Sequence, residues 1–338
     1  MPELSIIIVS WNVADLLRDC IESIHRSLAS SGIEYDIHVV DSASSDGTPA
    51  MLRQSFPEVV LYESPTNIGF AGGNNLALRA LGFGQGPNSK PTVPFVMLLN
   101  PDTRVESDAI PQLLNYLKAH PELVAVGPQL RYGDGTLQSS RRRFPTSASF
   151  FWESTPLERL WPDNPWKRHY HYAERSPDQE QRVGWLVGAA LLVRSSAIVR
   201  AGLLDEGFFM YSEELEWQYR LQLTNTPTTE LTNFEQIGYL PSAVITHYEG
   251  RSSEQILARR HINFQLSKIR LARLLKGPFV SACLRRFLIA CYLWELAVET
   301  AKLLIGHRRD LRRQRVAIYS EVLRSLNDER NFEEKASG

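Results

Sequence analysis

The sequence predicts an α/β fold with a doubly wound, mostly parallel sheet and a C-terminal helical extension. In the first 250 residues short apolar runs alternate with segments of helical spacing, which is typical of a parallel sheet covered by helices. Beyond Gly250 the pattern is helical, and the charge changes sign. Residues 1–250 hold 19 Lys and Arg against 29 Asp and Glu, whereas residues 251–338 hold 18 against 9. We therefore expect an α/β domain over residues 1–250 and a basic amphipathic helical region over residues 251–338.

The predicted strands follow one another along the chain. The first four are the apolar runs LSIIIVSW, YDIHVV, VVLYES and VPFVMLLN, which are rich in β-branched residues. From about residue 141 to 182 this pattern dissolves into a stretch rich in aromatic residues, Arg and Pro, which we interpret as an ordered excursion over the sheet. The runs VGWLVGAALLVR and IGYLPSAVITH then resume the strands, so the sheet is expected to be completed late in the domain.

Composition and cysteine usage bound the class of protein. A hydrophobic content of 43% and a charged content of 22% are ordinary for a globular chain. Cys20, Cys283 and Cys291 are too few and too scattered for a disulfide framework or a cysteine-based zinc site, which favours a reducing compartment. The N-terminus MPELSIIIVSWN lacks a basic segment before its apolar run, so it is predicted to be a first strand and not a signal peptide.

The segment between Gly277 and Gly306 has the pattern of an amphipathic helix. Its uncharged stretches fall far short of the roughly 20 residues that a membrane span requires. The predicted apolar face comprises Val280, Cys283, Phe287, Cys291, Trp294, Val298 and Ile305, and the opposite face comprises Arg285, Arg286, Glu295, Glu299 and Lys302.

The basic run HRRDLRRQR follows this helix, and such a combination is typical of an interfacial membrane helix. The alternative is that the apolar face packs on the α/β domain or on a second subunit. Nucleic acid is not expected as a partner, because the face is aliphatic.

Polar residues follow four of the predicted strands. Ser10 and Asn12 follow the first, Asp41 the second, and His247 the last. Because ligands of parallel α/β sheets bind at the carboxyl ends of the strands, these positions are candidates for a site.

The stretch MLLNPDTRV adds Asn100 and Asp102 to this set. Pro101 cannot donate a hydrogen bond to the sheet, so the strand has ended and Asp102 is presented at its carboxyl end. Asp102 is therefore a candidate ligand for a metal or a phosphate-bearing group. The alternative is that it caps the helix expected to begin near Ser107.

The stretch NIGFAGGNN has two interpretations. Asn67, Gly69, Gly72 and Gly73 precede a helical segment, so their backbone amides are candidates for binding a phosphate at a helix N-terminus. The stretch lacks the Lys-Ser/Thr element of a Walker loop and the spacing of a dinucleotide fold. The alternative is a glycine-rich helix start with no ligand.

The stretch DEGFFMYSEELEWQYRL places Glu213, Glu214 and Glu216 within four residues at the start of a helical pattern. One interpretation is that carboxylates stabilise a helix N-terminus. The other is that crowding and aromatic burial raise the pKa of one carboxyl, so that it accepts a proton in a reaction.

Taken in order, SIIIVSWN, VVDSASSDGT, NIGFAGGNN, LLNPDT, GAALLVR, FFMYSEELEW and HYEGRSS resemble the glycosyltransferase family 2 enzymes of the GT-A fold. More narrowly, they resemble the bacterial branch that includes rhamnosyltransferases building cell-envelope polysaccharides on lipid-linked acceptors. The resemblance covers about residues 4 to 275, and the ordered set is far more specific than any one motif.

The resemblance implies a donor site built from four residues. Asp41 matches the acidic residue that contacts the nucleotide base, Asn67 and Asn75 match asparagines of the donor pocket, and Asn100 lies close to the diphosphate.

The resemblance also implies which residues bind the metal and which lie on the acceptor side of the reaction. Asp102 and His247 match the residues that hold a divalent cation, Mg²⁺ or Mn²⁺, at the donor diphosphate. Glu214 matches the second acidic residue of the family's E-D pair, the general base. Gly188 and Ala189 match the acceptor cleft.

The implied function is an inverting, metal-dependent transfer of a sugar from a nucleoside diphosphate donor. The most plausible sugar is rhamnose from dTDP-rhamnose, and the acceptor is a lipid-linked or growing cell-envelope glycan. The enzyme is expected in the cytoplasm, peripheral at the inner face of the cytoplasmic membrane, with a homo-oligomer possible. The alternative is an inactive glycan-binding or scaffold protein descended from such an enzyme. A nucleotidylyltransferase is disfavoured because SWNVADLL offers no Gly-rich loop with Arg or Lys.

Three positions depart from the family pattern. Glu214 stands where most relatives have Asp, Gly184 replaces an Asp often found before the Trp, and Ser42 stands where Asn is usual. These departures affect the prediction of the donor and the acceptor more than the prediction of the reaction class.

Overall fold

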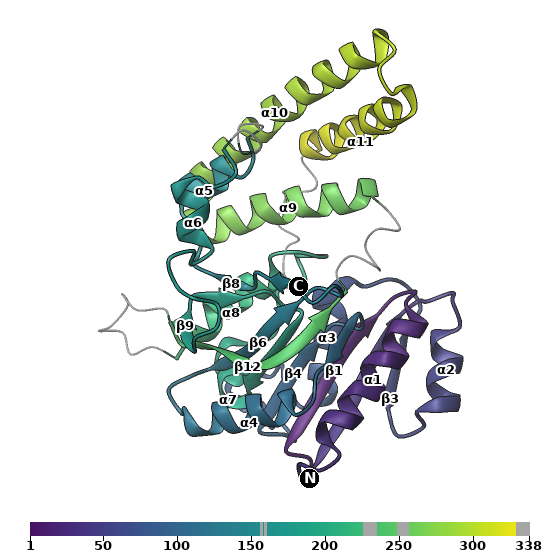
Figure 1. The fold of residues 1–338 in the computed structure, drawn as a ribbon, viewed down its shortest axis with the longest axis vertical. Helices are drawn as coiled ribbons and strands as arrows, with labels where there is room; N and C mark the ends of the chain where they lie inside the picture. The colour runs from purple at the N-terminus through teal and green to yellow at the C-terminus, as the bar shows by residue number, and fades with distance from the viewer. Residues whose placement is uncertain (156–157, 159–160, 226–234, 249–256, 329–338) are drawn as a thin grey trace. The chain divides into compact units, whose positions relative to one another are not determined.

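A computed structural model describes residues 1–155, 158, 161–225, 235–248 and 257–328 (Figure 1). The chain divides into two compact units. The first comprises Met1–Phe144, His171–Glu206 and Glu213–Ser252, and the second comprises Pro145–Tyr170, Gly207–Ser212 and Ser253–Gly338. The boundary predicted at residue 250 lies outside the described residues and stays a prediction.

The N-terminal half of the first unit alternates strands and helices, as its apolar runs predict. Its elements are β1 (Leu4–Ser10), α1 (Ala14–Leu28), β2 (Tyr35–Ser42), α2 (Thr48–Ser55), β3 (Val60–Ser64), α3 (Gly69–Ala80), a short 3-10 turn η1 (Gly86–Asn88) and β4 (Phe95–Leu99). The four strands pair in the order β3-β2-β1-β4, all parallel. Their carboxyl ends therefore lie at one edge of the sheet.

The later elements of this unit make the sheet mixed. They are β5 (Thr103–Val105), α4 (Ala109–Ala119), β6 (Ala125–Arg131), β7 (Leu137–Gln138), β8 (Arg141–Arg142), β9 (Gln181–Val183), β10 (Trp185–Leu186), β11 (Ala190–Arg194), α7 (Ser195–Ala201), α8 (Glu213–Leu223) and β12 (Ile237–His247). The full order is β3-β2-β1-β4-β11-β6-β12-β5, with β7 beside β6 and β9 beside β12; β8 and β10 form a separate ribbon. Because β11 is antiparallel to both β4 and β6, and β12 is parallel to β6, β12 runs in the same direction as β4.

The core lies on both faces of this sheet. Alternate residues of β1 point to opposite faces, so Ile6 and Ile8 pack in one buried cluster with α1 and α4, while Ile7 packs in the other with α3 and α8. At Gly73 helix α3 approaches β1 so closely that an added Cβ would lie 2.6 Å from a methyl carbon of Val9. This glycine therefore serves the packing of α3 on the strand.

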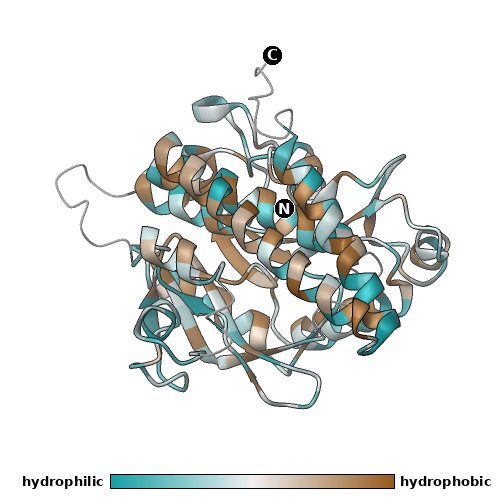
Figure 2. Cartoon of the chain, turned by 90° about the horizontal axis from the view of Figure 1, so that it is seen from above, coloured by the Kyte–Doolittle hydropathy of each residue, from teal (hydrophilic) through white to brown (hydrophobic). Residues whose placement is uncertain are grey.

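The second unit is helical. It contains α5 (Ser147–Trp152), α6 (Pro165–Tyr170), α9 (Leu257–Lys276), α10 (Pro278–Leu304) and α11 (Arg309–Asn327). Hydrophobic and hydrophilic residues alternate around these helices (Figure 2). Phe151 of α5 packs edge-on against Phe287 of α10, and the buried Lys268 of α9 donates a hydrogen bond to Ser154 at 2.8 Å. In the described part of the chain, none of the helices has the length and apolar content to cross a membrane.

The excursion predicted over residues 141–182 is divided between the two units. Residues 145–170 belong to the helical unit, where they form α5 and α6, and residues 171–182 belong to the first unit and lead into β9. Residues 145–170 are held by the packing of Phe151 on Phe287 of α10, a contact that sequence periodicity does not reveal.

The buried face of α10 differs from the apolar face that the sequence predicts. The buried positions are Ser281, Leu284, Leu288 and Glu299, none of which belongs to the predicted apolar face. Two residues of that face, Trp294 and Ile305, are exposed. Glu299 was expected on the polar face. It is buried because Arg312 of α11 donates a hydrogen bond to it at 2.6 Å, and Lys302 contributes a second ion pair at 3.3 Å.

We expect Glu299→Ala to lower the free energy of unfolding by about 3 kcal/mol, because it leaves the buried Arg312 without its carboxylate. Urea unfolding measures the change. The control is Glu321→Ala, an exposed carboxylate on α11, which should change stability by less than about 0.5 kcal/mol.

The same ion pair predicts a pH dependence. Burial alone would raise the pKa of Glu299, but its hydrogen bonds and ion pairs with Arg312 and Lys302 outweigh burial and lower it. The stabilisation is therefore present above the ordinary pKa of Glu and is lost as the pH falls through the lowered value. An equal loss of stability on acidification in wild type and Glu299→Ala would contradict this assignment.

Candidate active site

The polar residues that follow β1, β2, β4 and β12 lie at one edge of the sheet, since these strands share one direction. Residues preceding β11 lie at the same edge, because β11 runs the opposite way. There the backbone N–H of Asn100 donates to the carbonyl of Ala189 at 2.9 Å. The edge thus unites the ends of β1, β2 and β4 with the segment predicted to form the acceptor cleft.

The turn after β4 is fixed by its own hydrogen bonds. The Thr103 hydroxyl donates to the carbonyl of Asn100 at 2.7 Å, and the backbone N–H of Tyr248 donates to the carbonyl of Asp102 at 2.9 Å. Helix α4 starts only at Ala109, with Asp108 at its N-cap position. Asp102 therefore does not cap that helix, which excludes this alternative.

Asp102 and His247 face each other in a buried setting. His247 Nε2 lies 3.4 Å from an Asp102 carboxylate oxygen and 3.4 Å from Asn100 Nδ2. His247 Nδ1 lies 3.0 Å from the amide oxygen of Gln138 on β7. Because that oxygen can only accept, Nδ1 donates its hydrogen to it, and Nε2 is directed toward Asp102 and Asn100.

This donor set fits a divalent cation. A lone pair and a carboxylate oxygen 3.4 Å apart repel each other unless a proton or a cation lies between them. Adjacent ligands of an octahedral Mg²⁺ lie about 3 Å apart, close to the observed separation. The described residues contain no group of three or more His, Cys, Asp and Glu side chains placed to hold a metal, so the remaining ligands would come from other sources, such as a substrate or water.

Some buried polar atoms at the ends of β1 and β2 have no hydrogen-bond partner among the described residues. Among the described residues, none hydrogen-bonds to the hydroxyls of Ser10 and Ser42 or to Oδ1 of Asp41, although all three side chains are buried. The other carboxylate oxygen of Asp41 accepts the backbone N–H of Ser44 at 3.0 Å. Buried polar groups are nearly always satisfied, so this cluster is prepared for a ligand.

The two asparagines of the predicted donor pocket are placed differently. Asn67 precedes α3 and accepts the N–H of Gly69 at 3.0 Å, which sets the turn into the helix. Asn75 is buried, and its amide bonds to the N–H and C=O of Leu204 and to Glu206. Because the amide of Asn75 is committed to the chain itself, we do not place it in the donor site. With Gly73 packed on β1, the glycines here favour a helix start over a phosphate cradle.

The three carboxylates at the start of α8 have separate environments. Glu216 forms a two-point ion pair with Arg220, at 2.5 and 2.8 Å, and Arg220 also donates to the carbonyl of Ala201, so this pair is structural. Glu213 is buried, and burial together with the charge of Glu214 raises its pKa well above the ordinary value. Of the two neighbouring carboxyls, Glu213 is thus the one whose burial favours the protonated form.

Glu214 is half-buried and lies against Gly188. A Cβ added to Gly188 would lie 3.0 Å from both Cβ and Cγ of Glu214, so only glycine leaves this side chain in place. Gln218, one turn further along α8, exchanges hydrogen bonds with both backbone groups of Leu186 at 2.9 and 2.7 Å. These bonds hold the start of α8 against the segment before β11.

Some positions of the site have no sequence signal. Gln138, which orients His247, and Gln222, which binds the backbone of Gly184, belong to no motif. Gln218, which binds the backbone of β10, lies within DEGFFMYSEELEWQYRL, but no role was predicted for it. The structure also explains Gly184: a Cβ there would meet the backbone of Arg142, Arg143 and Phe144 at 3.0 to 3.2 Å. An Asp at this position has no room here.

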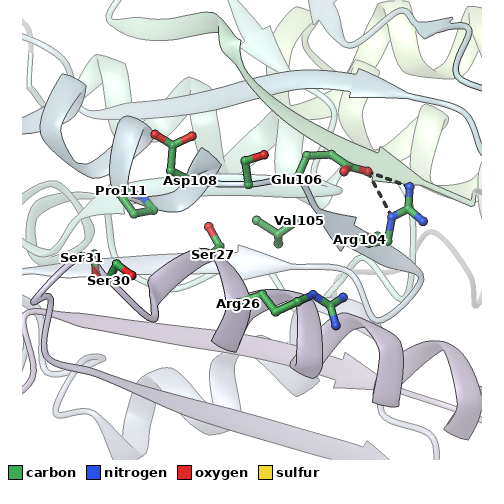
Figure 3. A pocket seen from close by; sticks show the side chains of 10 residues that line it. Arg26, Ser27, Ser30, Ser31, Arg104, Val105, Glu106, Asp108 and Pro111 are labelled. Atoms are coloured by element: carbon green, nitrogen blue, oxygen red, sulfur yellow. Dashed lines mark hydrogen bonds and ion pairs between the residues drawn. The ribbon is translucent and has the colours of Figure 1, made fainter.

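A hollow of about 740 Å³ lies away from this edge (Figure 3). It is bordered by the C-terminal end of α1, by β5 and by the start of α4, and contains none of the predicted site residues. Its two arginines are paired with carboxylates, Arg26 with Glu22 and Arg104 with Glu106. We assign the chemistry to the carboxyl edge, where buried polar atoms lack partners.

The mixed sheet, the carboxylate–histidine pair and the acidic helix start together define a glycosyltransferase of the GT-A fold. The chain belongs to glycosyl transferase family 2, whose family model matches residues 5–200.

The sequence is 32% identical to the N-acetylglucosaminyl-diphospho-decaprenol L-rhamnosyltransferase of Mycobacterium tuberculosis over 247 residues, which cover 70% of this chain and 77% of that protein. It is 24% identical to rhamnosyltransferase WbbL of Escherichia coli, covering 80% of this chain and 94% of that one. The mannosyltransferase PcManGT from Pyrobaculum calidifontis, solved in complex with GDP-Man and Mn²⁺, has a similar fold, with a TM-score of 0.50, 14% identity, and coverage of 99% of this chain and 88% of that one.

We expect Gly188→Ala to lower the glycosyl transfer rate at least ten-fold, because the new methyl group displaces Glu214 by several tenths of an ångström or more. The rate constant for transfer measures the effect, and donor affinity serves as the control, since the donor residues lie at other strand ends. Transfer at the wild-type rate would show that the position of Glu214 is immaterial.

Proposed function

We propose that this enzyme transfers rhamnose from dTDP-rhamnose, with inversion and with a divalent cation, to a lipid-linked or growing cell-envelope glycan. The observation that carries the proposal is the placement of the Asp102 carboxylate 3.4 Å from Nε2 of His247, beside the Asn100 amide. The names of the two bacterial relatives, both rhamnosyltransferases, support the sugar.

In this proposal Asp102 and His247 hold Mg²⁺ or Mn²⁺ against the diphosphate of the donor. The cation offsets the negative charge that develops on the leaving phosphate. Gln138 keeps the His247 ring oriented with Nε2 toward Asp102, as partners of metal-binding histidines do. Asn100 offers an amide N–H to the same region, and the Mn²⁺ held by the mannosyltransferase of similar fold supports the choice of ion.

The nucleotide base is assigned to the cluster at the ends of β1 and β2. Asp41 has one carboxylate oxygen without a partner among the described residues, and a thymine or uracil ring presents one imide N–H to such an acceptor. Ser10, which lies beside Asp41 in the register of β1 and β2, adds a hydroxyl that can donate to a ring carbonyl. Asn67 lies at the start of α3 and is the remaining candidate for the donor pocket.

Glu214 is assigned as the general base that takes the proton of the attacking hydroxyl. Its neighbour Glu213 is buried, and burial together with the charge of Glu214 raises the pKa of Glu213, whereas the half-buried Glu214 is the carboxylate that an attacking hydroxyl can approach. Glu214 lies beside Gly188, in the segment proposed as the acceptor cleft. An attacking hydroxyl bound there would lose its proton to Glu214 as the new bond forms.

A lipid-linked acceptor places the reaction at a membrane surface. The acceptor in the name of the mycobacterial relative, a decaprenol carrying N-acetylglucosaminyl diphosphate, supports this class of substrate. We accordingly propose that the enzyme works in the cytoplasm at the inner face of the membrane.

A panel of nucleotide sugars tests the donor and the cation together. We expect dTDP-rhamnose to raise the unfolding temperature in Mn²⁺ and not in chelator, because only the loaded site holds the diphosphate. Asp102→Ala should abolish both the shift and turnover, whereas Asp19→Ala, an exposed carboxylate of α1, should retain them. Equal stabilisation of Asp102→Ala by donor and Mn²⁺ would refute the cation site.

A comparison of two glutamines tests the base. Glu214→Gln should retain donor binding and lose transfer by about 10³-fold, because the proton acceptor is gone. Glu213→Gln should keep most of the transfer rate, since an amide and a protonated carboxyl are both neutral. The opposite ranking of the two variants would assign the base to Glu213.

A further inference from the structure

Helix α10 carries an apolar stripe that no described residue covers. The exposed residues of the stripe are Phe279, Ala282, Ala290, Leu293, Trp294, Ala297, Ala301, Leu304 and Ile305. Phe279, Leu304 and Ile305 are each 79 to 80% exposed, and Trp294 is 65% exposed. Within α10, which the structure describes in full, Arg286 is the one charged residue among the exposed positions. Arg286 lies between Ala282 and Ala290, so the uninterrupted apolar surface runs from Ala290 to Ile305, and an exposed surface of this kind marks a contact with a partner.

The stripe has a basic group at each end. Arg273 and Lys276 are exposed just before Phe279, at the end of α9. Arg308, Arg309 and Arg313 are exposed just after Ile305, in the turn into α11 and its first residues. Over residues 257–328 as a whole, 15 Lys and Arg stand against 5 Asp and Glu.

The positions of these charges favour a lipid surface over a second copy of the chain as the partner of the stripe. If two α10 helices paired in antiparallel fashion, Arg273 and Lys276 of one copy would meet Arg308 and Arg309 of the other. In parallel pairing each basic end would meet its own equivalent. Either arrangement sets like charges together, which is unfavourable. Anionic lipid headgroups would instead neutralise both ends at once.

The dimensions and residue types fit a helix lying in the plane of a membrane interface. Twenty-seven residues of α helix are about 40 Å long, and the helix is not apolar enough to span. Trp294 lies mid-stripe, and Trp is the side chain that most favours the headgroup level. The alanines between the larger residues leave the helix axis free to approach the acyl boundary.

We propose that the exposed stripe of α10, together with the basic residues at its two ends, is a docking surface for an anionic lipid bilayer. The apolar side chains enter the headgroup and upper acyl region, and the arginines and lysine pair with lipid phosphates. This surface shares Trp294 and Ile305 with the predicted apolar face and adds Phe279 and Leu304, which were not assigned to that face. The proposal stands on exposure and charge, and it accords with a lipid-linked acceptor without depending on it.

Flotation with vesicles tests the proposal on the full-length protein. We expect binding to phosphatidylcholine vesicles that contain phosphatidylglycerol, with little binding to phosphatidylcholine alone. Leu304→Ser with Ile305→Ser should lower the partition coefficient at least ten-fold, because two apolar side chains no longer leave water. Arg308→Gln with Arg309→Gln should lower it by about ten-fold at low salt and less at high salt. Leu223→Ser, an exposed leucine of α8, is the matched control and should bind as wild type.

Three results would overturn the proposal: no binding of wild type to anionic vesicles, equal binding of the Leu304/Ile305 double variant, or a wild-type dimer in sedimentation that this variant converts to monomer. Vesicle binding needs neither donor nor cation, so Asp102→Ala should bind vesicles as wild type does. The Leu304/Ile305 double variant should keep its stabilisation by donor and Mn²⁺. Failure of the docking surface and failure of the proposed chemistry are thereby separated.

Discussion

The pairing of β12 with β5 is the constraint on which the site depends. It sets His247 opposite Thr103, directly after Asp102, and so joins two residues 145 positions apart in the sequence. The Thr103 hydroxyl closes the turn after β4, and Tyr248 anchors the carbonyl of Asp102 from the other side. With both backbones held, the imidazole and the carboxylate remain close together. Several hydrogen bonds thus fix the short distance between His247 Nε2 and the Asp102 carboxylate.

Burial then divides similar side chains into different roles. Three glutamates at the start of α8 lie within four residues, yet burial raises the pKa of Glu213, Glu216 is paired with Arg220, and Glu214 borders Gly188. The same principle separates Asn67 from Asn75, since the second has its amide fully engaged with Leu204 and Glu206. In each case the surroundings of a side chain, and not its residue type, decide whether it can meet a substrate.

The helical unit shows a related contrast. Burying Glu299 is tolerated because Arg312 and Lys302 surround it, and this fixes the face of α10 that turns inward. The exposed stripe of α10 is the surface that we propose contacts a partner. An enzyme that acts on an acceptor held in a membrane benefits from a surface that brings it to that membrane, because confinement raises the local concentration of the acceptor.

The sequence by itself determined the α/β alternation, the helical C-terminal region, the family and the strand ends that carry Asp41, Asn100, Asp102 and His247. These follow from local patterns, because periodicity and turn residues act over a few positions. The tertiary structure decided which candidates meet. Asn75 binds the chain itself, and Gln138 binds His247 although it belongs to no motif. Glu299 was predicted on the polar face of α10 and is buried because it binds Arg312. Such outcomes depend on contacts between distant segments, which no local pattern encodes.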